Sequence, residues 1–71
     1  MASEMIHIHL NGQAEQVPSQ TSVADLLERL GRKPIGLAVE VNRDVIPRSR
    51  HASTYVVEGD RVEIVQMVGG G

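Results

Sequence analysis

The fold prediction rests on residues 22–31, whose sequence is Ser-Val-Ala-Asp-Leu-Leu-Glu-Arg-Leu-Gly. Four apolar residues in this segment follow the i, i+3, i+4, i+7 spacing of an amphipathic helix: Val23, Leu26, Leu27 and Leu30. Ser22 and Asp25 have the spacing of a capping box, with aspartate in place of the preferred glutamate. Gly31 suits the left-handed residue that ends a helix, and Pro34 prevents its continuation. The sequence therefore predicts one helix over about residues 22–30.

On the N-terminal side of this helix, the sequence predicts a β-hairpin. Ile6, Ile8 and Leu10 alternate with His7 and His9, which is the period of a strand with one apolar face. The Asn11-Gly12 pair that follows is the strongest short signal for a type I′ turn. A short return strand is then expected over residues 13–17, ended by Pro18.

On the C-terminal side, the sequence predicts further short strands. Leu37, Val39 and Val41 alternate again, and Asn42-Arg43-Asp44 is expected to form a turn. Beyond that turn the expected elements are a strand at 45–46 cut off by Pro47, a polar loop or single helical turn at 48–54, an extended piece at 55–57, a tight turn at 58–60 and a last strand over 61–68.

These elements predict a single small domain of the α+β class. One helix covers only one face of a sheet, so two layers are expected. The chain has 71 residues, and a domain this small buries only about 60% of its unfolded surface. We expect the folded domain to span residues 1–67, with residues 1–4 as a disordered extension and residues 68–71 as a flexible tail. So small a core favours a carrier, a binding module or a small subunit over a self-sufficient enzyme.

The composition excludes several functional classes. Cysteine is absent, which removes disulfides, thiolate metal sites and cysteine nucleophiles. The formal charge is −2 and Tyr55 is the only aromatic residue, so neither the charge nor the stacking surfaces of a nucleic-acid-binding protein are present. No segment has the length of a membrane span or the pattern of a signal peptide, and a cytoplasmic location is expected.

The C-terminal glycines are the feature that can carry chemistry. The last predicted strand leads directly into Gly69-Gly70-Gly71. Glycine has no side chain and samples backbone conformations freely, so such a tail can pass through a channel that any Cβ would block. The four residues from Val68 to Gly71 extend over roughly 13 Å. On the glycines alone, an idle frayed terminus is the more common explanation.

Two longer segments of the chain resemble one known protein family. Residues 37–48, Leu-Ala-Val-Glu-Val-Asn-Arg-Asp-Val-Ile-Pro-Arg, resemble the middle of the ThiS family of sulfur carriers. Residues 58–65, Glu-Gly-Asp-Arg-Val-Glu-Ile-Val, followed by Val68 and the three glycines, resemble its C-terminal end. The hairpin and the leucine-rich helix come in the expected order, so the resemblance covers the chain from about Met5 onward.

The resemblance implies a β-grasp, or ubiquitin-like, fold, with a mixed sheet of four to five strands packed on one main helix. It implies that Gly71 is the site of the chemistry, with Gly70 next to it. Gly69 belongs to the same tail, but the function is carried over only to the final two glycines. A ThiF-like enzyme would adenylate the Gly71 carboxylate with ATP and magnesium, and sulfur from a donor such as a cysteine desulfurase would give a thiocarboxylate. A ThiG-like thiazole synthase would then accept the sulfur for thiamine biosynthesis. The protein would be a co-substrate and would bind no cofactor of its own.

Other side chains are candidates for partner binding. In the last predicted strand, Val65 and Met67 share a face opposite the core, so we expect them, with Val68, to contact the partner enzymes. For Arg43, Arg48, Arg50 and Arg61, a solvated surface position is the more common case than a partner contact. His7 and His9 share a strand face, but they are too few to define a metal site, and none is predicted.

Three alternative functions fit the same sequence. The first is a molybdopterin-synthase small subunit with the same diglycine chemistry, which the Val45-Ile46-Pro47-Arg48 segment and the short length disfavour. The second is a ubiquitin-like modifier that is conjugated to lysines or acts in tRNA thiolation. The third is a β-grasp interaction module with an idle tail.

Overall fold

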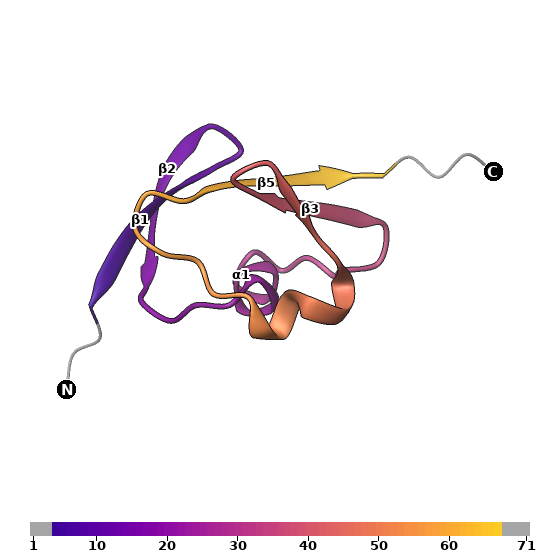
Figure 1. Cartoon of the computed structure of the whole chain (residues 1–71), viewed down its shortest axis with the longest axis horizontal. Helices are drawn as coiled ribbons and strands as arrows, with labels where there is room; N and C mark the ends of the chain where they lie inside the picture. Colours follow the sequence, from indigo (N-terminus) through magenta and orange to yellow (C-terminus); the bar gives the residue numbers. More distant parts are fainter. Residues whose placement is uncertain (1–3, 68–71) are drawn as a thin grey trace.

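A computed structural model describes residues 4–67 of the chain (Figure 1). Within this range the elements follow the order β1 (Met5–Leu10), β2 (Gln13–Pro18), α1 (Val23–Arg29), β3 (Leu37–Val41), β4 (Asp44–Ile46), the 3₁₀ helix η1 (Arg48–Ser53) and β5 (Arg61–Gln66). The predictions for residues 1–3 and 68–71 lie outside the described residues.

Within residues 4–67, five strands form one mixed sheet in the order β2-β1-β5-β3-β4. The first strand and the last strand of the chain lie side by side in the middle of the sheet and run parallel. All other neighbours are antiparallel: β1 with β2, β3 with β4, and β3 with β5. β5 therefore joins two hairpins that would otherwise not touch.

Helix α1 begins and ends as its sequence predicts. The Asp25 amide donates to Ser22 Oγ at 3.0 Å, and the Ser22 amide donates to Asp25 Oδ2 at 3.2 Å, which completes the capping box. At the other end Gly31 has φ +69°, and the amides of Gly31 and Arg32 donate to the carbonyls of Glu28 and Leu27. This pair of bonds is the Schellman arrangement, and it turns the chain away from the helix axis.

The core lies between α1 and one face of the sheet (Figure 1). The helix contributes the buried Val23, Leu26 and Leu27. The sheet and the loop before β5 contribute the other buried apolar residues: Ile8, Val17, Val39, Val56, Val62 and Ile64. The apolar core cluster is wholly aliphatic. Within residues 4–67, α1 is the single α-helix and covers only one side of the sheet, as the sequence predicted.

The remaining segments follow the prediction in part. The polar loop over 48–54 is the 3₁₀ helix η1, and the extended piece at 55–57 pairs with the rest only through a bridge between Tyr55 and Ser22. The last strand was predicted to continue to residue 68, but β5 ends at Gln66 because its partner β3 begins at Leu37, opposite Gln66. Among residues 4–67, no helix is long and apolar enough to cross a membrane.

The two hairpin turns have the same backbone conformation but different residues. Asn11 and Gly12 have φ values of 49° and 83°, as a type I′ turn requires. At the β3–β4 turn, Asn42 has φ 52° and Arg43 has φ 75°. A left-handed conformation costs a side-chain-bearing residue such as arginine about 1–2 kcal/mol. The second turn is therefore strained where the first turn has a glycine.

We expect Arg43→Gly to stabilise the protein by about 0.5–1 kcal/mol, because the strain relieved exceeds the extra entropy that glycine loses on folding. For a chain of this size, this gain raises Tm by about 2–8 °C, measurable by calorimetry. Arg50→Gly is the matched control, because Arg50 is also exposed but has no positive φ, and it should lower Tm. An equal rise in both variants would contradict the explanation.

Candidate functional site

The candidate site is the C-terminal end of β5 and the residues that follow it. β5 is the central strand of the sheet and ends at Gln66. Met67 is the last described residue. Val68, Gly69, Gly70 and Gly71, which the sequence predicts to be the working tail, lie outside the described residues. What the structure does show is how the strand that carries them is held.

Two asparagines from opposite hairpins hold β5 by its backbone. Asn11 accepts from the Ile64 amide at 2.8 Å and donates through Nδ2 to the Ile64 carbonyl at 3.3 Å. The side-chain oxygen of Asn42 accepts from the backbone amide of Arg61 at 2.9 Å. The backbone amide of Asn42 donates to the Arg61 carbonyl at 2.8 Å. Each asparagine thus imitates the pairing of one more strand residue, and β5 is fixed from both sides.

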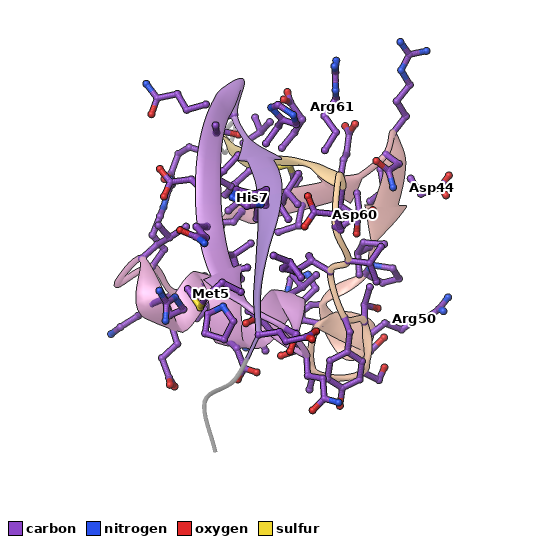
Figure 2. The ribbon with its side chains drawn as sticks, turned by 90° about the vertical axis from the view of Figure 1, so that its left-hand side faces the viewer. Met5, His7, Asp44, Arg50, Asp60 and Arg61 are labelled. Atoms are coloured by element: carbon purple, nitrogen blue, oxygen red, sulfur yellow. The ribbon has the colours of Figure 1, made fainter. Side chains whose placement is uncertain are left out.

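The loop before β5 is organised by the buried carboxylate of Asp60. Its Oδ2 accepts from the Val57 amide at 2.8 Å, and its Oδ1 accepts from Asn42 Nδ2 at 2.9 Å. Figure 2 shows Asp60 between β1, which carries His7, and β4, which begins at Asp44. Asp60 therefore sets where β5 enters the sheet.

The exit of β5 is held by the segment that follows α1. The Met67 amide donates to the Gly36 carbonyl at 2.7 Å, one residue beyond the end of the strand. Arg32 Nη2 donates to Gln66 Oε1 at 3.2 Å. The position from which the tail leaves the sheet is therefore defined by contacts with residues 32–36.

The sheet face opposite α1 is open to solvent near this exit. Val65 and Met67 are 50% and 59% exposed, in agreement with the predicted alternation that buries Val62 and Ile64. Val65 lies opposite the partly exposed Ala38 of β3, which adds a third apolar side chain to the same face. The face therefore has an apolar area beside the tail, whose function as a partner contact stays a prediction.

On the same face, the residue pair next to Val65 and Ala38 is acidic. Glu63 of β5 lies directly opposite Glu40 of β3. Like charges that face each other across a strand pair repel, so this arrangement lowers the stability of the sheet. Among residues 4–67, the only basic side chain with a nitrogen within 4 Å of a carboxylate oxygen is His7, whose Nδ1 lies 3.5 Å from Glu58 Oε2. The two glutamates therefore have no basic partner within 4 Å.

The histidines do not form a metal-binding group in the described part of the chain. His7 is exposed and pairs with Glu58, and residues 4–67 contain no group of three or more metal-ligating side chains. His51 is buried on η1 and donates from Nε2 to the Ile46 carbonyl at 3.0 Å, which ties η1 to β4. Four arginines are exposed, in agreement with a solvated surface position: Arg43, Arg48, Arg50 and Arg61.

The topology defines the class of protein. A mixed five-stranded sheet with one covering helix, in which the first and last strands pair in parallel, is a ubiquitin-like β-grasp fold. The structure matches the crystal structure of the thiamine biosynthesis protein ThiS from Geobacter metallireducens with a TM-score of 0.82. That match has 30% sequence identity and covers 93% of this chain and 100% of the other.

Sequence comparison identifies the family. The model of the ThiS family matches residues 7–71, so the chain belongs to the ThiS family. The chain is 33% identical to the sulfur carrier protein ThiS of Escherichia coli over 66 residues, which cover 93% of this chain and 100% of that protein. It is 38% identical over 64 residues to a thiazole synthase of Magnetococcus marinus. There the match covers 90% of this chain but only 20% of the relative.

Sequence reasoning missed the residues that position the strand. The sequence predicts the two asparagines and Asp60 only as turn residues, because the side-chain contacts that link Asn11 to Ile64, and Asn42 to Asp60 and Arg61, span 18 to 53 positions of the chain. The one available signal was that both hairpin turns begin with asparagine, a residue whose side chain can imitate backbone.

We expect Asp60→Ala to destabilise the protein by about 1–3 kcal/mol, because the Val57 amide and the Asn42 side chain would lose a buried acceptor. Chemical denaturation followed by circular dichroism measures this loss. Asp44→Ala is the control, since Asp44 is exposed, and a change within about 0.5 kcal/mol is expected there. Equal losses in the two variants would show that Asp60 has no special structural function.

Proposed function

We propose that this protein is a sulfur carrier for thiazole formation in thiamine biosynthesis and that the carboxylate of Gly71 is the group that carries the sulfur. The observation that carries the proposal is the match of the ThiS family model as far as Gly71, together with a relative from E. coli that is named a sulfur carrier protein. The protein acts as a co-substrate, and the catalytic groups belong to its partner enzymes.

The chemistry follows from the low reactivity of a carboxylate. A Gly71 carboxylate oxygen attacks the α-phosphorus of ATP on an adenylating enzyme, with magnesium on the phosphates, and pyrophosphate leaves. The acyl-adenylate now has a good leaving group. The outer sulfur of a persulfide donor attacks the acyl carbon, and AMP leaves. A thiol then attacks the donor's inner sulfur and forms a disulfide with it, so the bond between the two persulfide sulfurs breaks and the thiocarboxylate is released. The carrier itself supplies no cofactor to these steps.

The relatives support thiazole synthase as the acceptor. Two relatives carry the name thiazole synthase, and this chain corresponds to 20% and 19% of their lengths. A segment similar to this chain is thus part of the same polypeptide in those proteins. We propose that this chain meets its synthase as a separate partner. A ThiF-like adenylating enzyme and a persulfide donor, such as a cysteine desulfurase, complete the set of partners.

The fold suits delivery of a terminal group. The strand that leads to the tail is central in the sheet and is held by Asn11, Asn42 and Asp60, so its direction is fixed by contacts on both sides. The exposed apolar area of Val65 and Met67, which Val68 is proposed to extend, gives the enzymes a surface to hold while the glycines enter an active site. Glu40 and Glu63 beside it add charge that favours a basic partner surface.

We expect the chemistry to be visible as a change of mass. The protein is incubated with a ThiF-type enzyme, ATP, magnesium and a persulfide donor, and its intact mass is recorded. A gain equal to the replacement of one oxygen by sulfur, mapped to Gly71 by fragmentation, is the expected result. Deletion of Gly70 and Gly71 should abolish the gain while the circular dichroism spectrum stays unchanged.

The control is the same enzyme with its own carrier. If that carrier gains sulfur and this chain does not, the carrier function is wrong for this protein and the interaction module becomes the better explanation. Loss of partner binding in the deletion variant separates the two functions further, because a module with an idle tail would keep its binding.

We expect Met67→Glu to lower kcat/KM for adenylation roughly tenfold, because a charge would replace an apolar contact beside the tail. Val57→Glu is the matched control: Val57 is also 59% exposed but lies before the start of β5, at the opposite end of that strand. Adenylation is followed as pyrophosphate release. Equal kinetics for the Met67 variant and the unmodified chain would exclude this residue from the interface.

A further inference from the structure

The structure has a surface groove that the proposed sulfur chemistry does not use. Its lining comes from the C-terminal part of α1, the residues that follow it and η1. Figure 1 shows α1 and η1 beside each other on the same side of the sheet. Its volume is about 530 Å³. Aliphatic side chains form much of its lining, among them Ala24, Leu27 and Pro34.

The rim of this groove is basic. Arg32, Lys33 and Arg48 line it, against a single carboxylate, that of Glu28. The whole chain has nine acidic residues and seven basic ones, so the protein is acidic. Three of the seven basic residues nevertheless line this one groove. None of them lies within 4 Å of a carboxylate among residues 4–67. Lys33 and Arg48 are also exposed, so these two cations are available to a partner.

The lining decides between kinds of anionic ligand. The only aromatic residue of the chain, Tyr55, does not line the groove, so a nucleotide would find no surface on which to stack its base. The groove lies beside the C-terminal end of α1, where the helix dipole repels an anion buried against the backbone. Carboxylates at the rim, with an apolar side chain on the aliphatic floor, satisfy both constraints.

We propose that this groove binds an acidic segment of a partner protein that inserts an aliphatic side chain. The groove adjoins the exit of the last strand, because Arg32 lines it and also donates to Gln66. A partner seated there would lie next to the tail. The inference goes beyond the proposed function, since binding in the groove needs neither ATP nor sulfur.

The test is a titration of the full ¹⁵N-labelled chain with a blocked peptide that alternates glutamate and leucine, followed by amide chemical shifts. We expect shifts centred on Leu27, Gly31, Lys33 and His51, and weaker binding as salt is added. The double variant Lys33→Glu, Arg48→Glu should lower the affinity roughly tenfold or more. Both residues are exposed, so the variant should stay folded.

The matched control is Arg43→Glu, Arg61→Glu, which changes the net charge equally at exposed positions outside the groove. It should keep the affinity within about twofold, allowing for screened long-range charge effects. Equal losses in both double variants, or no shifts at millimolar peptide, would overturn the proposal. A peptide with serine in place of leucine should bind more weakly, and equal affinity would overturn the aliphatic contact. Because no enzyme is present, failure here leaves the sulfur carrier function untouched.

Discussion

The pairing of β1 with β5 is the junction on which the rest of the structure depends. Only His9 with Arg61 and Leu10 with Val62 pair directly, and the Asn11 side chain extends this ladder to the backbone of Ile64. On either side of this junction lies a two-stranded hairpin, and such hairpins are marginal alone in water. The sheet therefore exists as one unit only when the two ends of the folded region meet.

The end of β5 lies between two surfaces of different chemistry. The open face of the sheet is apolar at Val65 and acidic at the Glu40–Glu63 pair. The groove on the helix side is aliphatic with a basic rim. Arg32 and Gln66 connect the groove to the strand end, so both surfaces flank the same exit. The two surfaces therefore suit contacts of different chemistry beside the end of one strand.

Local sequence patterns predicted the elements of this fold well. The capping box of Ser22, the left-handed Gly31 and the Asn11-Gly12 turn each depend on residues within a few positions, and all three are present. The end of β5 was predicted too late, because the length of a strand is set by its neighbour and not by its own alternation. The expected α+β class and the exposure of Val65 and Met67 followed from the same local patterns.

Contacts between distant residues could not be predicted in this way. Asn11 and Ile64 are 53 positions apart, and Asn42 and Asp60 are 18 apart, so no periodicity links them. The groove depends on η1 packing beside α1. No sequence pattern in the residues between these two elements predicts that packing. The tail glycines are the opposite case, since their importance rests on the sequence and the family alone.

The central position of β5 also has a mechanical consequence. An enzyme that draws the tail into its active site pulls along the axis of this strand. Hydrogen bonds to β3 on one side, and to β1 and the Asn11 side chain on the other, would then be loaded together in shear. An edge strand under the same load could peel away one bond at a time. A central strand bonded on both sides therefore resists a pull along its axis better than an edge strand would.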